Sequence, residues 1–253
     1  MKKYLKAYLY NRPLFYSFIR PKELELFTKE MPFRKPILDF GCGDGFFAGT
    51  LFQGKKIDVG IDINEKVILE ALGSGVYKKA ITFNGKKLPF SRGYFSTVIS
   101  NCVLEHVENL PLILREINRV IKRGGFFYLT VMTDMWNDHL IGGSLFGKRY
   151  IKWMKKIQIH YNLLSQSEWE KLFEKSGFKV IEKVGYIDKK TSHLIELFHY
   201  LSVDSLISYK LFKKWVLFPL RFKVIENLIL KRIRNTYKPK KNSSTVFYAL
   251  KKI

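Results

Sequence analysis

A run of glycines that follows an acidic residue is the part of this chain best suited to chemistry. Residues 36–45 read Pro-Ile-Leu-Asp-Phe-Gly-Cys-Gly-Asp-Gly, so Asp39 precedes glycines at three alternate positions, Gly41, Gly43 and Gly45. A turn without side chains lets a ligand lie against the backbone. The spacing differs from the G-x-G-x-x-G of dinucleotide sites, and the preceding carboxylate favours a cationic ligand over a pyrophosphate. A glycine turn that binds nothing is the alternative, and the surrounding motifs argue against it.

A second acid, Asp62, lies about twenty residues after the turn, at the end of the apolar run 57–63. At this distance, a carboxylate at the end of the next strand can accept hydrogen bonds from both hydroxyls of a ribose. The alternative is that Asp62 caps the helix expected over 65–72. Further along, Asn84 and Gly85 follow a third apolar run, and they either contact a ligand or form an ordinary turn.

The elements that must hold these residues alternate between strands and helices. Short, nearly continuous apolar runs predict the strands, and apolar residues at helical spacing predict the helices. This order favours a parallel, doubly wound α/β sheet that is buried on both faces. The predicted strands cover 37–39, 57–63, 80–83, 95–101, 126–132, 178–186 and 244–251, and the predicted helices cover 46–52, 65–72, 112–121 and a segment that starts at Ser165. Basic residues and glycines at 122–125 are expected to end the third helix.

Taken together, these motifs resemble those of the class I S-adenosylmethionine (SAM)-dependent methyltransferases. The likeness is close over residues 36–132 and looser over 178–186. Leu-Pro-Phe at 88–90 and Leu-Glu-His at 104–106 are most similar to the small-molecule enzymes of methyltransferase type 11. The resemblance implies SAM as the cofactor. It also implies a Rossmann-like, seven-stranded, mostly parallel sheet whose last strand returns antiparallel between strands five and six.

The resemblance assigns the cofactor site to residues at the ends of four strands. In the family, an acid at the position of Asn84 contacts the adenine amino group, and an amide oxygen can still accept that hydrogen bond. Asn101 and Leu104 are expected to line the methionine and adenine edges. The predicted cofactor-binding residues are Asp39, Gly41, Gly43, Asp62, Asn84, Gly85, Asn101 and Leu104.

The methyl acceptor is expected to meet residues that follow the fourth and fifth strands. The sulfonium methyl is already activated, so the protein mainly supplies alignment, and a hydroxyl acceptor also needs a general base. His106 is the candidate catalytic base, and Glu105, His139, His160 and Tyr161 are candidate substrate residues. Packing or capping is the alternative role for Glu105 and for each histidine. The residue pattern predicts no metal site.

The chain is expected to divide into one sheet domain with helical additions. Residues 1–35 form an N-terminal helical extension, and residues 36–187 with 244–253 form the SAM-binding domain. Within that domain, residues 133–163 leave the carboxyl end of strand five, where ligands bind in open α/β sheets, so they form the expected substrate lid. Residues 188–243 form a basic, amphipathic helical insertion.

Positive charge concentrates in the last quarter of the chain. The net charge is +23, and residues 189–253 hold fifteen Lys and Arg against three acids, interleaved with aromatic and aliphatic side chains. Basic residues interrupt 211–230 too often for a membrane-spanning helix. Three interpretations remain open: solvated amphipathic helices packed on the sheet, a surface for an anionic membrane, or a surface for nucleic acid.

These observations predict a SAM-dependent methyltransferase acting on a small-molecule or a lipid- or glycan-linked acceptor. The alternative is a tRNA or rRNA methyltransferase whose basic surface binds nucleic acid. Enzymes that methylate base amino groups usually carry Asn/Asp-Pro-Pro-Tyr/Phe after strand four, whereas residues 100–103 read Ser-Asn-Cys-Val. Cys42 and Cys102 cannot form a disulfide framework and fit a reducing cytoplasm, with peripheral membrane association as a further expectation.

Overall fold

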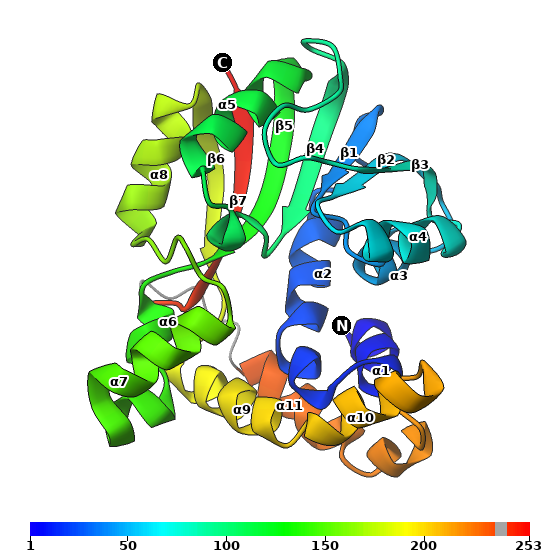
Figure 1. The fold of residues 1–253 in the computed structure, drawn as a ribbon, viewed down its shortest axis with the longest axis vertical. Coiled ribbons are helices and arrows are strands. Elements are labelled where there is room, and N and C mark those ends of the chain that lie inside the picture. The colour runs from blue at the N-terminus through cyan, green and yellow to red at the C-terminus, as the bar shows by residue number, and fades with distance from the viewer. Residues whose placement is uncertain (236–241) are drawn as a thin grey trace.

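The molecule is built on one seven-stranded sheet with the strand order β3-β2-β1-β4-β5-β7-β6 (Figure 1). This computed structural model describes residues 1–235 and 242–253. β7 runs antiparallel between β5 and β6, and the other pairings are parallel, which confirms the predicted doubly wound α/β fold. The strands are β1 (Ile37–Phe40), β2 (Ile57–Asp62), β3 (Tyr77–Thr82), β4 (Phe95–Asn101), β5 (Ile121–Met132), β6 (Phe178–Gly185) and β7 (Thr245–Lys252).

Both faces of the sheet are buried, because neighbouring residues along a strand pack into opposite core layers. Ile37 and Ile99 belong to one apolar cluster, whereas Leu38 and Val98 belong to the other. Two-sided burial is the reason that nearly continuous apolar runs predicted these strands. The first face is covered by α2 (Arg20–Lys29), α3 (Phe46–Phe52) and α4 (Glu65–Gly73), and the second by α5 (Leu110–Val120) and α8 (Gln166–Lys175) (Figure 1).

The start of α8 is fixed by a reciprocal pair of hydrogen bonds. The backbone N–H of Ser165 donates to the Glu168 carboxylate at 2.8 Å, and the N–H of Glu168 donates to Ser165 Oγ at 3.4 Å. This capping box satisfies backbone donors that a helix leaves open at its first turn. The start of the helix was therefore predictable from two residue types at the correct spacing.

The prediction was wrong at the junction of α5 and β5. Residues 122–125 lie inside β5 and do not end a helix. Gly124 has a φ of +71°, and a Cβ on Gly125 would lie 2.9 Å from the carbonyl oxygen of Ser96 on the neighbouring strand. The pairing of β4 with β5 shifts register beside these glycines, so they form an irregular part of the strand rather than a helix end.

A second layer of helices lies across the carboxyl edge of the sheet (Figure 1). It contains α1 (Lys2–Asn11), 3₁₀ helix η1 (Leu14–Phe18), α6 (Met135–Asp138), α7 (Ile141–Ile157), α9 (Lys189–Tyr200), α10 (Val203–Phe212), η3 (Pro219–Lys223) and α11 (Glu226–Asn235). The expected insertion over 188–243 is helical through α11, and residues 236–241 lie outside the described residues. Over the described ranges, no helix combines the length and apolar character needed to cross a bilayer.

Candidate functional site

The glycine turn after β1 is held by the neighbouring strand and presents open backbone. The N–H groups of Gly41 and Cys42 donate to the carbonyl oxygen of Ile61 at 2.8 and 2.9 Å. Gly41 has a φ of +74°, and a Cβ there would lie 2.4 Å from a methyl group of Val103. A Cβ on Gly43, in contrast, would meet no atom within 4 Å. Gly41 is therefore required by packing, whereas Gly43 leaves a bare surface that a ligand can approach.

Asp62 connects the end of β2 to this turn. Its two carboxylate oxygens accept hydrogen bonds from the N–H groups of Gly43 and Asn64, each at 3.0 Å. The helix-capping role belongs to Asn64, whose side chain accepts from the N–H of Lys66 at the start of α4. The Asp62 carboxylate thus lies at the edge of the bare turn, where the ribose interpretation requires an acceptor.

Asp39 is buried beneath the turn and is paired with a residue that sequence reasoning missed. The hydroxyl of Tyr77 donates to its carboxylate at 2.6 Å. Burial raises the pKa of Asp39 to about 7, the Tyr77 hydrogen bond opposes this rise, and the negative charge of Asp62 adds to it. A cationic ligand beside these two acids would stabilise both carboxylates. Tyr77 carries only a weak signal in the sequence, because its partner is set by the pairing of β3 with β2.

Asn84 and Gly85 form a turn at the end of β3. The side-chain oxygen of Asn84 accepts from the N–H groups of Lys86 and Lys87 at 3.0 and 3.4 Å, and Gly85 has a φ of +76°. The ordinary-turn interpretation therefore describes this segment as it stands. Contact between Asn84 and adenine stays a prediction.

The two remaining cofactor candidates lie after β4. Asn101 accepts a hydrogen bond from the Thr130 hydroxyl at 3.0 Å, which joins the carboxyl ends of β4 and β5. The Leu104 side chain is fully buried in the same apolar cluster as Phe40 and Phe83. Leu104 is therefore a core residue here rather than a residue with a free edge.

A cavity of about 220 Å³ lies at the carboxyl ends of β4 and β5, between the sheet and the helical layer. Three predicted residues meet there: Glu105, His106 and His160. The wall combines the carboxyl ends of β4 and β5 with the N-terminal extension, the expected lid and α9 of the insertion, which are far apart in the sequence. It consists of Phe15, Tyr16, Ile19, Arg20, Cys102, Glu105, His106, Met132, Trp136, Met154, Gln158, His160, Ile195, Glu196 and His199.

Glu105 is a fully buried acid on the wall of this cavity. Neither carboxylate oxygen has a hydrogen-bond partner among the described residues. Burial raises the pKa of Glu105 to about 7, so the neutral and charged forms are both populated near neutral pH. The cap of α5 is Asn109, whose side chain accepts from the N–H of Leu112. Glu105 therefore has no capping role.

His106 and His160 lie side by side, with ring centroids 5.0 Å apart. His106 Nδ1 lies 3.1 Å from the carbonyl oxygen of Ile159, so Nδ1 carries the proton and the Nε2 of the neutral ring keeps a lone pair. Surrounding protein lowers the pKa of His106 below 6.5, although part of the side chain still reaches solvent. Burial lowers the pKa of His160 to about 3. Both rings are therefore neutral at physiological pH.

An arginine that the sequence did not single out reaches the same cavity. Arg20 Nη1 lies 2.6 Å from the carboxylate of Glu23, which is fully buried and also accepts from the Tyr186 hydroxyl at 2.7 Å. The positive charge of Arg20 opposes the rise in the pKa of Glu105. Arg20 and Glu23 are three residues apart on α2, but their burial depends on how α2 packs across the sheet edge, which the sequence does not show.

Two predicted substrate residues lie elsewhere. His139 is buried, and its Nδ1 lies 2.6 Å from the hydroxyl of Ser244, which is itself 2.7 Å from the hydroxyl of Ser192. This network joins the segment after α6 to the start of β7, so the assignment of His139 to the acceptor site was wrong. Tyr161 is 53% exposed, lies outside the cavity wall and contributes its backbone N–H to the carbonyl of Glu105.

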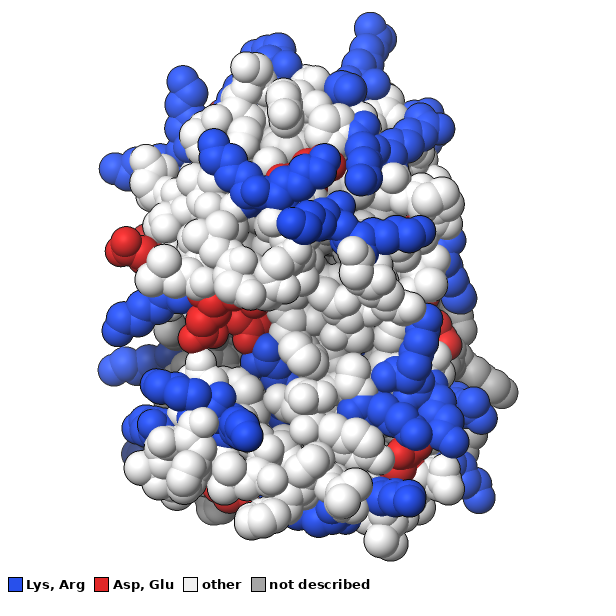
Figure 2. All heavy atoms as spheres, turned by 90° about the vertical axis from the view of Figure 1, so that its right-hand side faces the viewer, with Lys and Arg blue, Asp and Glu red and all other residues white. Residues whose placement is uncertain are grey.

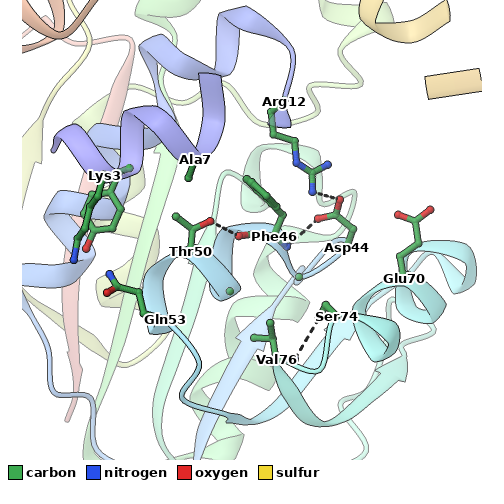
Figure 3. A pocket seen from close by; sticks show the side chains of 13 residues that line it. Lys3, Ala7, Arg12, Asp44, Phe46, Thr50, Gln53, Glu70, Ser74 and Val76 are labelled. Atoms are coloured by element: carbon green, nitrogen blue, oxygen red, sulfur yellow. Dashed lines mark hydrogen bonds and ion pairs between the residues drawn. The ribbon is translucent and has the colours of Figure 1, made fainter. Parts of the chain in front are cut away.

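A larger cavity of about 660 Å³ lies on the outer side of the glycine turn, between α1, α3 and α4 (Figure 3). Arg12 extends from the end of α1 to an ion pair with Asp44 and lies 4.1 Å from the centroid of the Phe46 ring (Figure 3). The contact of Arg12 with Asp44 joins the N-terminal extension to the turn. The wall of this cavity includes Asp44 and Gly45 but none of the eight predicted cofactor residues.

The family model and two of the similar proteins below are methyltransferases. A family model described as a methyltransferase domain matches residues 10–183. An uncharacterized protein of Methanocaldococcus jannaschii is 29% identical over 174 residues, which cover 68% of this chain and 78% of that protein. The ubiquinone biosynthesis O-methyltransferase of Rhizobium etli is 24% identical over 208 residues, which cover 77% of this chain and 82% of that enzyme.

A solved structure supports the same fold. It is a SAM-dependent methyltransferase of Thermotoga maritima, described as a possible histamine N-methyltransferase, with a TM-score of 0.62 and 19% identity. The match covers 95% of this chain and 92% of that one. The strand order, the bare turn with its two acids and the family match lead to one conclusion: this chain belongs to the methyltransferase-domain family and is a class I SAM-dependent methyltransferase.

Proposed function

We propose that this methyltransferase transfers a methyl group from SAM to a small-molecule or a lipid- or glycan-linked acceptor held in the 220 Å³ cavity. The observation that carries the proposal is the meeting of Glu105, His106 and Arg20 on the wall of one cavity at the carboxyl edge of the sheet. Ligands of open α/β folds bind at this edge. The bare turn follows β1 and the cavity lies at the ends of β4 and β5, so both lie along this edge.

The residues around the turn fit SAM, which carries a sulfonium, an amino group and a ribose. Asp39 and Asp62 supply negative charge, and the open face of Gly43 leaves room for close approach. SAM supplies a methyl group on a positively charged sulfur, which is activated for in-line displacement. The contribution of the chain is to hold the reacting groups in line and to exclude water. Asp62 is the expected ribose acceptor, and Asn101, at the carboxyl end of β4, is a further expected cofactor contact.

His106 is the proposed general base for a hydroxyl acceptor. The carbonyl of Ile159 fixes the Nδ1–H tautomer, so Nε2 can take a proton from the acceptor. The lowered pKa of His106 keeps the ring in its basic form at neutral pH. The rate should therefore fall as the pH drops below the pKa of His106, which lies under 6.5.

Glu105 and Arg20 are the proposed recognition groups of the cavity. A neutral Glu105 can donate a hydrogen bond to the acceptor, and a charged Glu105 can accept one. Apolar side chains such as Trp136, Met154 and Ile195 form much of the remaining wall and suit an acceptor with an apolar part. One relative is named as an O-methyltransferase of ubiquinone biosynthesis, which agrees with a small, largely apolar acceptor.

The test is to identify the methyl acceptor with labelled SAM and fractionated cell extract. We expect label in the small-molecule or lipid fraction. With that acceptor, His106→Ala should lower kcat about a hundredfold while leaving the affinity for SAM unchanged. Transfer of label to the RNA fraction instead would contradict the proposed acceptor class and favour the RNA methyltransferase alternative.

A further inference from the structure

We propose that the surface formed by residues 201–235, named here the docking surface, binds an anionic membrane. The docking surface comprises α10, η3, α11 and the segments that join them. This inference goes beyond methyl transfer and does not depend on the acceptor. It rests on apolar side chains that are exposed on this surface, where a protein surrounded only by water normally exposes polar ones.

The α10 helix buries polar side chains and exposes aliphatic ones. Ser205 and Ser208 are buried on its inner side, whereas Leu206, Ile207 and Leu211 are 52, 55 and 69% exposed. A helix on a soluble domain normally buries its aliphatic side chains and exposes its hydroxyls. The reversed order indicates that the outer side of α10 meets an apolar phase.

The buried serines are satisfied by the protein itself, so this orientation is built into the fold. The hydroxyl of Ser208 donates to the carbonyl oxygen of Lys214, and the hydroxyl of Ser202 donates to the carbonyl oxygen of Phe198 at 2.6 Å. The hydroxyl of Tyr209 on the same helix donates to Glu70 of α4 at 2.8 Å, and rotation of α10 to bury its aliphatic side chains would break this contact between elements. The exposed aliphatic side is therefore a stable feature of the helix.

The apolar surface continues beyond α10. Phe218, Leu220, Val224 and Leu228 are 70, 78, 88 and 69% exposed. Single exposed apolar side chains are ordinary, but a run of them over consecutive segments marks an interaction surface. Aliphatic side chains predominate in this run, which suits insertion between lipid chains better than stacking against nucleic-acid bases.

Positive charge surrounds these apolar side chains. Residues 201–235 hold eight Lys and Arg and two acids. Both acids are already paired: Asp204 lies 3.0 Å from Arg221, and Glu226 accepts from the Tyr10 hydroxyl at 2.8 Å. Apolar side chains flanked by cations are the pattern of a surface that inserts shallowly among anionic headgroups.

Figure 2 views the side of the molecule on which α4 and α10 lie. Acidic side chains gather at mid-height beside a hollow, and the lower part formed around α10 shows uncharged surface flanked by Lys and Arg. Lys and Arg also lie over the upper part of this face, and a few acidic side chains lie in its lower part. The uncharged surface around α10 with its flanking cations is the part of this face that suits an anionic surface.

A hydrogen bond from Tyr209 connects the docking surface to the methyltransferase fold, and a second aromatic ring packs on Tyr209. The hydroxyl of Tyr209 on α10 donates to Glu70 of α4 at 2.8 Å. Trp215 stacks on the Tyr209 ring, with centroids 4.2 Å apart. A membrane that binds α10 therefore binds a body connected directly to the cofactor half of the sheet.

The test is cosedimentation of the full chain with vesicles of phosphatidylcholine alone and of phosphatidylcholine mixed with phosphatidylglycerol. We expect strong binding to the anionic vesicles only. Ile207→Ser and Phe218→Ser should each weaken that binding about tenfold. Ile181→Ser on β6 is the matched control, since Ile181 is 53% exposed on the edge strand of the sheet, and it should bind like the unaltered chain.

A second set of variants tests the charge. Lys213→Gln and Lys214→Gln should each lower anionic-vesicle binding about fivefold. Lys55→Gln, in the exposed loop before β2, should have little effect. Thermal unfolding of every variant, together with its SAM affinity, shows that the fold and the cofactor site are intact.

Three results would overturn the proposal. The first is unchanged vesicle binding by Ile207→Ser and Phe218→Ser. The second is strongly salt-dependent binding to RNA with no binding to either vesicle, which would assign the basic surface to nucleic acid. The third is self-association in solution that Ile207→Ser abolishes, with no vesicle binding, which would assign the surface to a second copy of the chain.

Discussion

At the scale of single residues, two glycines of the turn are needed for different reasons: Gly41 for packing and Gly43 for access of a ligand. Gly41 and Gly43 both have a positive φ, but only Gly41 faces a neighbouring side chain. Gly41→Ala should therefore destabilise the fold by more than 2 kcal/mol, as a rough estimate, because the new Cβ collides with Val103. Gly43→Ala should cost about 1 kcal/mol of stability and mainly weaken SAM binding.

Denaturant unfolding and SAM titration of the two variants distinguish these effects. Equal losses of stability with unchanged SAM affinity in both variants would mean that the turn has only a structural role.

The raised pKa of Asp39 makes stability depend on pH. The folded state holds the Asp39 proton up to about pH 7, whereas an unfolded aspartate releases it near pH 3.8. Folding is therefore favoured at low pH, and this contribution is lost as the pH rises through that window. Between pH 5 and 8 the unaltered chain should lose about 3 kcal/mol more than Asp39→Asn.

The measurement is denaturant unfolding without SAM at several pH values. Glu105 contributes a slope of the same sign, so Asp39→Asn should retain part of the pH dependence. An identical slope in the two proteins would contradict the assignment.

Residue roles were predictable where they depend on local spacing and not where they depend on packing. Asp39, the glycines and Asp62 were placed at one turn correctly because strand ends and turns follow the sequence closely, and their contact with SAM stays a prediction. Tyr77 was missed because its partner Asp39 lies on another strand. Arg20 and Glu23 pair within α2, and they were missed because the sequence does not show that this pair is buried against Tyr186. His139 was misassigned because a histidine in a lid gives no sign of whether its ring faces a cavity or a buried serine.

At the scale of elements, the expected lid depends on a carboxylate supplied by the insertion. Glu196 of α9 is buried and accepts from the N–H groups of Ile141 and Gly142 and from the hydroxyl of Tyr150. It thus caps α7 from outside that helix. Glu196→Ala should lower the free energy of unfolding by about 2–4 kcal/mol, because the donors lose a buried acceptor.

Thermal or denaturant unfolding checks this value, with Glu174→Ala as a control on the exposed surface of α8. A stability loss no larger than that of the control would show that Glu196 does not hold α7.

Most strands and helices followed from apolar periodicity, and the junction of α5 with β5 shows where that fails. Basic residues followed by glycines usually end a helix. Here both glycines are needed inside β5: Gly124 has a φ of +71°, and at Gly125 the backbone approaches the neighbouring strand too closely for a side chain. Only the paired strand reveals this requirement.

At the scale of the whole molecule, the sheet and the helical layer contribute different parts of the candidate site. The sheet carries the bare turn and its acids at one edge, and the helical layer closes the 220 Å³ cavity over the same edge. The sequence predicted the strands and the turn of the cofactor half because the motif lies on consecutive elements. The cavity could not be predicted because its wall combines the N-terminal extension, the lid and α9 through long-range packing.

The most direct measurement of the central claim is calorimetric titration of the full chain with SAM. We expect one SAM to bind per chain, and Asp62→Ala should weaken binding at least about tenfold, because the variant lacks the ribose acceptor and the support of the Gly43 N–H. Glu65→Ala, on the exposed first turn of α4, is the control and should bind like the unaltered chain. Absence of SAM binding by the folded, unaltered chain, or equal affinity in Asp62→Ala, would contradict the account.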